Sequence, residues 1–123
     1  MTRNYEEKQA ARKERLLERA EKAAAEGENH CLLAQVRRDT GDEDGAQAAY
    51  EAALATAPEH LRALYELGRL EFDRLRWSRA QDLLARFVDC AGRSGFAAAL
   101  DDQIQAARAM ADVCEGKLAG AGR

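Results

Sequence analysis

The sequence predicts an all-α fold: a short α-solenoid in which helix-turn-helix repeats lie between N-terminal and C-terminal capping helices. Its 123 residues suit one domain, and they include one proline and much alanine, leucine, glutamate and arginine, which favour helices. When the chain is compared with itself at a displacement of 34 positions, small and large apolar residues align. This period is typical of arrays of helix pairs and indicates two repeats, at about 27–60 and 61–94.

Composition and charge narrow the classes of function. The formal net charge of −3 argues against nucleic acid as the main partner, because nucleic-acid-binding domains usually carry a basic surface. No stretch approaches the roughly 20 apolar residues that a membrane-spanning helix needs. The chain is charged from Arg3 onward, without the apolar segment of a signal peptide, so we expect a cytoplasmic protein.

The cysteines do not suggest a metal site or a disulfide framework. Cys31, Cys90 and Cys114 are odd in number and widely spaced, which fits neither zinc-binding patterns nor disulfide pairing. Free cysteine behaves as a small apolar side chain, so we expect Cys90 and Cys114 to be buried. We expect no cofactor and no metal.

Residues 1–26 are predicted to form a charged N-terminal helix, because they contain good helix formers and neither proline nor glycine. The apolar face of this helix is thin, so packing stabilises it little. We expect it to cap the first repeat, and the open alternative is that it pairs with another chain. Its apolar residues are Tyr5, Leu16, Leu17, Ala20, Ala23 and Ala24.

The first repeat is predicted to follow a break at residues 27–29, where glycine and asparagine interrupt the helix-forming composition. Residues 30–40 then form its first helix, with Leu33, Ala34 and Val36 facing inward. The second helix of this repeat is expected to end at about residue 56.

The turn between these two helices has residues suited to it. Gly41 can adopt a positive φ, and Asp42 or Asp44 can cap the following helix, because carboxylates accept hydrogen bonds from its first turn. Residues 40–51 also nearly match a calcium-binding loop, but Thr40 stands where the first aspartate ligand is required. The repeat needs the second half of this stretch as helix, so capping explains the aspartates.

The second repeat is predicted to consist of helices over about 59–73 and 77–91. The turn between them is short, and Leu75 occupies the position of the glycine in the first repeat. Gly68 and Ala80 are small, which lets the two helices approach each other closely.

Residues 95–118 are predicted to form a C-terminal helix that covers the end of the second repeat, and residues 119–123 a flexible tail. Two repeats are fewer than the three that usually form a stable array, so flanking helices or a second chain must complete the core. We therefore expect six helices in three antiparallel layers. The apolar stripe of the C-terminal helix consists of Phe96, Leu100, Ile104, Ala107, Ala111, Cys114 and Leu118.

The two repeats resemble the tetratricopeptide-repeat (TPR) family, whose pattern is W-x2-L-G-x2-Y, then A-x3-F, then P, over 34 residues. The resemblance covers about 27–94, and the aromatic after the small residue is replaced by Arg37 in one copy and Glu71 in the other. In the second copy the motif positions are Leu64, Leu67, Gly68, Ala80, Leu84 and Gly92. In the first copy they are His30, Leu33, Ala34, Ala46, Tyr50 and Pro58.

The resemblance implies a concave groove that receives an extended peptide, lined by the first helix of each repeat. Helical spacing independently places Arg62, Tyr65, Arg69 and Phe72 on one face, and such arginine and aromatic side chains are good binding anchors. Family members that bind a C-terminal carboxylate use lysine and asparagine where this chain has cysteine and glutamine, so that mode is not expected. The implied groove positions are Glu28, Cys31, Gln35, Arg38, Arg62, Tyr65, Arg69 and Phe72.

We therefore expect a protein–protein interaction module, adaptor or chaperone-like, whose peptide partner carries acidic and apolar side chains. The alternative is a structural self-assembly protein whose short array is completed by a homo-dimer or larger homo-oligomer. We do not expect an enzyme, because His30 and His60 lack the surrounding groups of a catalytic site and His60 is expected to face solvent.

Overall fold

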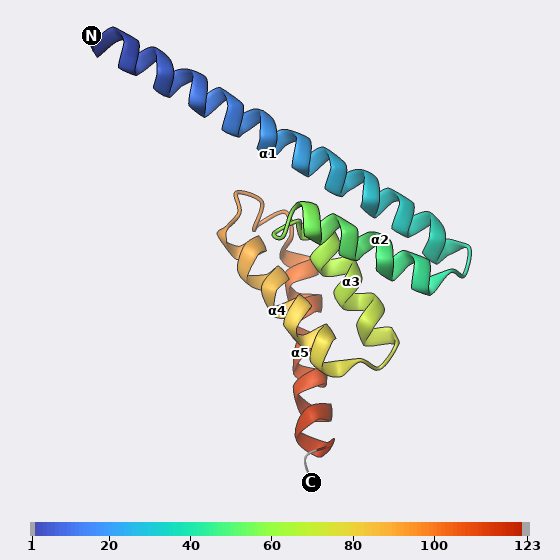
Figure 1. Cartoon of the computed structure of the whole chain (residues 1–123). Helices are drawn as coiled ribbons and strands as arrows, with labels where there is room; N and C mark the ends of the chain where they lie inside the picture. The colour runs from blue at the N-terminus through green and yellow to red at the C-terminus, as the bar shows by residue number, and fades with distance from the viewer. Residues whose placement is uncertain (1, 122–123) are drawn as a thin grey trace.

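The computed structural model describes residues 2–121, and within that range the chain is entirely helical apart from its turns. This confirms the prediction of an all-α protein. None of these helices is long and apolar enough to cross a membrane. The five helices are α1 (Thr2–Asp39), α2 (Glu43–Thr56), α3 (Leu61–Asp73), α4 (Trp77–Arg93) and α5 (Asp101–Ala121), shown in Figure 1.

The helices pack mainly against their neighbours in sequence. α1 packs along α2, α3 packs along α4, and α5 lies against α4. Contacts between α2 and α3 join the first helix pair to the second. The N-terminal half of α1 extends beyond the rest of the protein (Figure 1).

The predicted break at residues 27–29 is absent, because α1 continues from Thr2 to Asp39 as one helix. The described residues therefore form five helices, and the prediction of six is wrong. Gly27 has a packing role instead: a Cβ atom added there would lie 2.8 Å from Cδ2 of His60. The absence of a side chain lets the segment before α3 lie directly against α1.

The inward face of α1 also differs from the prediction. Cys31 and Ala34 are completely buried, whereas Leu33 is 44% exposed and Val36 is 60% exposed. Small residues of α1 face α2, so the larger apolar residues lie on the opposite side, where no described helix covers them. The full core consists of Cys31, Ala34, Ala46, Ala49, Tyr50, Ala53, Ala63, Leu64, Leu67, Leu70, Ala80, Leu83, Leu84, Phe87, Ala91, Ile104, Ala107 and Cys114.

The turn before α2 has the predicted capping residue. The backbone N–H of Gly45 donates a 2.9 Å hydrogen bond to Oδ1 of Asp42, which is the N-cap of α2. Helix α2 occupies the second half of the stretch that resembles a calcium-binding loop, so this stretch does not adopt the loop conformation.

The two turns within the helix pairs share an unusual backbone conformation. Gly41 has a φ of 88°, and Leu75, which lies 34 positions later, has a φ of 63°. Glycine adopts this left-handed region freely, whereas a residue with a side chain is strained there by about 1–2 kcal/mol. The second turn therefore repeats the geometry of the first without its glycine.

Replacing Leu75 by glycine should stabilise the protein by about 1 kcal/mol, because it removes this strain and the lost side chain is 66% exposed. Thermal and urea unfolding followed by circular dichroism would measure the gain. The reverse change, Gly41→Leu, is the matched control and should lower stability by a similar amount. A Leu75→Gly variant less stable than the wild type would contradict the strain.

The C-terminal segment begins its helix later than predicted. Residues 94–100 form turns, and α5 begins at Asp101. Phe96 is 67% exposed, so it does not belong to the buried stripe, whereas Ile104, Ala107 and Cys114 are buried as expected. α5 continues as helix through residues 119–121 of the predicted tail, and residues 122 and 123 lie outside the described range.

Candidate functional site

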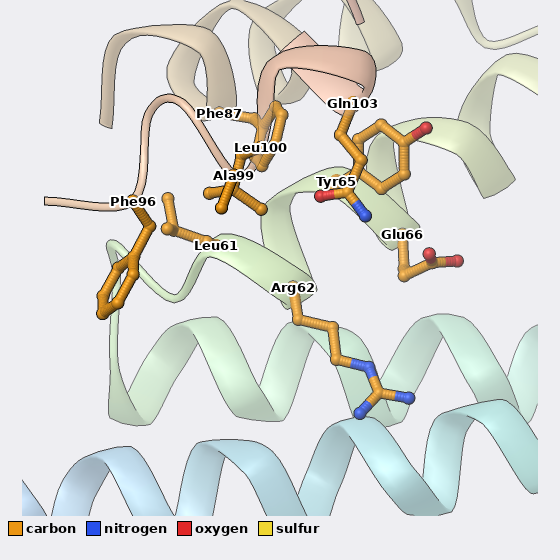
Figure 2. Close-up of a pocket in the computed structure, with 9 residues that line it drawn as sticks. All are labelled: Leu61, Arg62, Tyr65, Glu66, Phe87, Phe96, Ala99, Leu100 and Gln103. Atoms are coloured by element: carbon orange, nitrogen blue, oxygen red, sulfur yellow. The ribbon is translucent and has the colours of Figure 1, made fainter. Parts of the chain in front are cut away.

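A hollow of about 430 Å³ lies between α3, α4 and the turn that leads into α5. We call it the α3 hollow, and Figure 2 shows its lining side chains. Its walls are mainly apolar, with one basic, one acidic and one amide side chain. Ligand-binding pockets usually have this size and composition. The lining residues are Leu61, Arg62, Tyr65, Glu66, Phe87, Phe96, Ala99, Leu100 and Gln103.

Aromatic side chains form one wall of the α3 hollow. The rings of Tyr65 and Phe87 lie 5.0 Å apart between centroids, inclined at 45°. The guanidinium carbon of Arg69 lies 5.6 Å from the centroid of the Tyr65 ring, a cation–π contact. Phe87 is buried in the core, so this wall is held rigidly from behind.

Ion pairs and hydrogen bonds between α1 and α3 hold the basic side chains near the hollow. The guanidinium group of Arg62 donates to Oε1 of Glu28 and to Oε1 of Gln35. Arg38 donates to Oδ2 of Asp73 at 2.6 Å. Arg62 and Arg38 are therefore already paired within the chain, and a bound carboxylate would have to share these groups.

Arg69 is less constrained. Its Nη1 atom lies 3.6 Å from Oε1 of Glu66, one turn earlier on α3, and its side chain is 45% exposed. An exposed ion pair of this kind contributes little free energy. Arg69 is thus the cation beside the hollow that can most easily reorient toward a bound acidic group.

The structure brings only some of the predicted groove residues together. Arg62 and Tyr65 line the hollow, and Arg69 stacks on Tyr65 beside it. Gln35 and Arg38 both lie on α1. Hydrogen bonds connect Gln35 to Arg62 and Arg38 to Asp73, both of which lie on α3. They border the hollow rather than line it.

Two predicted groove residues have other roles. Phe72 packs edge-on against Trp77, with ring centroids 5.4 Å apart, and belongs to the margin of the core. Cys31 is fully buried, so it does not line a groove as the resemblance implied. The reason is that the α1 face that carries it is covered by α2 and by the segment before α3.

Sequence reasoning missed the part of the site contributed by later segments. Phe87 lies on α4, Phe96, Ala99 and Leu100 lie in the turns after it, and Gln103 lies on α5. The apolar pattern assigned Phe96 and Leu100 to a capping helix. The signal available was Gly92-Arg93-Ser94-Gly95, a composition typical of a loop, which indicates that the chain changes direction before the apolar pattern resumes.

A second polar cluster joins α1 to the start of α3. His60 is the N-cap of α3, and its Nδ1 accepts a 3.2 Å hydrogen bond from the backbone N–H of Ala63. The Sγ atom of Cys31 lies 3.8 Å from the same Nδ1, and Oε2 of Glu28 lies 3.4 Å from Nε2. The His60 side chain is only 12% exposed, so the prediction that it faces solvent is wrong.

The order of thiol, imidazole and carboxylate in this cluster is one that activates cysteine nucleophiles in enzymes. Here burial, together with the charge of Glu28, raises the pKa of Cys31 to about 11. The thiol therefore stays protonated at neutral pH, and its complete burial prevents a substrate from reaching it. The cluster does not provide a catalytic nucleophile.

Among the residues that the structure describes, these three side chains also have the arrangement of a possible metal site. Their ligand atoms all lie within 4.8 Å of one another. Cysteine, histidine and glutamate are ligands that zinc accepts. However, Glu28 is already paired with Arg62, and the imidazole caps α3 through one nitrogen and faces Glu28 with the other. Protein partners therefore satisfy these groups, and we assign the cluster to the packing of α1 against α3.

Comparison with known proteins finds no match, whether among protein-family models, curated proteins or solved structures.

Proposed function

We propose that this chain is a protein–protein interaction module, adaptor or chaperone-like, that binds a peptide segment at the α3 hollow and is not an enzyme. The observation that carries the proposal is the hollow itself, an apolar depression of about 430 Å³ beside Arg69. An apolar side chain of a peptide would fill it, and acidic neighbours of that side chain would pair with Arg69 and Arg62.

We also propose that the fold is a short α-solenoid of the TPR type, capped at its C-terminal end by α5, whereas the N-terminal half of α1 extends beyond the helix pairs and does not cover the first of them. Two features support this reading: the helix pairs α1–α2 and α3–α4 follow each other, and their turns at Gly41 and Leu75 have matching positive φ. The close approach of Gly68 to Leu84 agrees with the small residue that the repeat requires there. A cytoplasmic location is part of the same proposal.

A peptide library displayed on phage and selected on the immobilised chain tests the function. We expect the enriched peptides to share one large apolar residue flanked by aspartate or glutamate. For one such peptide, Arg69→Glu should weaken binding at least about tenfold, the effect of losing one charge-assisted contact and adding a repulsion. Isothermal titration calorimetry measures the change.

Two further variants make the test specific to the site. Gln103 is exposed at the hollow, so Gln103→Trp should fill the space and abolish binding without disturbing the core. Arg108→Glu makes the same charge change on an exposed position of α5 outside the hollow and should bind like the wild type. Equal affinities for all four proteins would place the peptide elsewhere and overturn the proposal.

A further inference from the structure

A second hollow, of about 260 Å³, adjoins the α3 hollow. We call it the α4 hollow, because the last turn of α4 forms one of its walls. Leu61 and Phe96 line both hollows, so the two depressions share a boundary. In Figure 2 these two side chains lie at one end of the α3 hollow, and Glu66 lies at the other. The α4 hollow is lined by Glu59, Leu61, Cys90, Arg93, Ser94 and Phe96.

Phe96 stands at the boundary of the two hollows with its side chain 67% exposed. Hydrogen bonds fix its backbone on both sides. Its N–H donates to Oγ of Ser94 at 3.2 Å, and its carbonyl accepts from the N–H of Leu100 at 2.9 Å. Because aromatic side chains dominate the energetics of many interfaces, an exposed ring on a fixed backbone is suited to contact a partner that crosses from one hollow to the other.

The α4 hollow has the same kind of rim as the α3 hollow. Nη2 of Arg93 lies 3.4 Å from Oε1 of Glu59 and 3.0 Å from Oδ2 of Asp89, and the arginine side chain is 60% exposed. Exposed ion pairs contribute little free energy, so Arg93 can turn toward another carboxylate. Arg69 can do the same two turns along α3 from Leu61. The joined hollows therefore have an available cation near each end.

We infer that the peptide partner has two apolar anchors, one in the α3 hollow and a second in the α4 hollow, and that it crosses Phe96 between them. This inference rests on the proposed function and adds to the single apolar residue that the α3 hollow takes. Alternate side chains of an extended peptide point in the same direction, so at least one residue separates the two anchors. An acidic residue beyond the second anchor pairs with Arg93, as another does with Arg69.

Cys90 provides a probe of the α4 hollow that the chain already contains. It is partly exposed, whereas Cys31 and Cys114 are completely buried. N-ethylmaleimide should therefore modify the folded chain at Cys90 and fill the α4 hollow, leaving the α3 hollow open. Cys90→Ser is the matched control, because it removes the reactive thiol and nearly keeps its size.

Calorimetric titration with a phage-selected peptide tests the inference. The selected peptides should carry two apolar residues, and modification of Cys90 should weaken binding about tenfold, the effect of losing one anchor. The Cys90→Ser chain treated with the reagent should bind like the untreated wild type. Two altered peptides have one or the other apolar residue replaced by alanine. Exactly one of them should bind the modified and unmodified chains equally, because it has already lost the anchor in the α4 hollow.

Arg93→Glu changes the rim of the α4 hollow at an exposed position and serves as a second test, should circular dichroism show that the modified chain is misfolded. It should weaken the full peptide about tenfold and leave a peptide truncated to its first anchor unaffected. If no peptide is selected, or none responds to Arg69→Glu and Gln103→Trp, the proposed function fails and the inference with it. If those two variants weaken binding but changes at Cys90 and Arg93 do not, the peptide ends at the α3 hollow and only the inference is overturned.

Discussion

Replacing Gly68 by leucine should destabilise the protein by about 3 kcal/mol, the largest effect that we expect from a single change at a small residue. A Cβ atom at this position would lie 2.7 Å from Cδ2 and 2.8 Å from Cγ of Leu84. Leu84 is fully buried and cannot move aside, so α3 and α4 must separate to admit even the first carbon. Urea unfolding followed by circular dichroism measures the loss.

Gly92 provides the matched control for this variant. It also lies in a helix, but a Cβ atom added there would meet nothing within 4 Å. Gly92→Ala should therefore leave stability unchanged or raise it by up to about 0.5 kcal/mol, because alanine favours helix. If Gly68→Leu unfolds at the urea concentration of the wild type, then α3 and α4 do not pack as described.

The parts of the fold that the sequence predicted are those governed by local chemistry. The cap of α2 by Asp42 depends on one side chain and the backbone next to it, and the structure contains this hydrogen bond. The small residues at Gly68 and Ala80 indicated a close helix contact, and both are buried between α3 and α4. The phase of 34 residues also placed Leu75 in a turn equivalent to that of Gly41. The structure adds that both residues have a positive φ.

The errors arise where a residue acts on a distant segment. Gly27 resembles a helix break in sequence, but its missing side chain accommodates His60, which lies 33 positions later. A single glycine costs a helix only about 1 kcal/mol, which such a tertiary contact readily offsets. Leu33 and Val36 suggested an inward face because they are large, yet the small residues of α1 form the close contact with α2.

Only part of the candidate site could be predicted from the sequence, because its other residues come together through contacts between distant segments. Arg62 and Tyr65 lie on one helix, so periodicity alone places them on one face. Phe96, Leu100 and Gln103 join them only because the chain turns back after α4, and no local pattern specifies the direction of that turn. Burial of Cys31 likewise depends on which helix covers α1, a tertiary property.

The second large effect concerns Glu71, which stands where the TPR pattern has an aromatic residue. Its side chain is 2% exposed, and one carboxylate oxygen lies 3.4 Å from Nη1 of Arg76. Arg76→Met should destabilise the protein by about 2 kcal/mol, because it removes this partner from a buried charged group. Arg76 also donates to Gln47, but that contact is exposed and contributes little.

A double substitution separates the cost of the stranded charge from the loss of the arginine itself. Glu71→Leu in the Arg76→Met background replaces the buried carboxylate with an apolar side chain of similar size, so no charged group remains unpaired in the core. The double variant should regain most of the lost free energy of unfolding and approach the wild type. If the double variant is less stable than Arg76→Met alone, Glu71 has partners that matter more than Arg76, and the ion pair is not what keeps the carboxylate in the core.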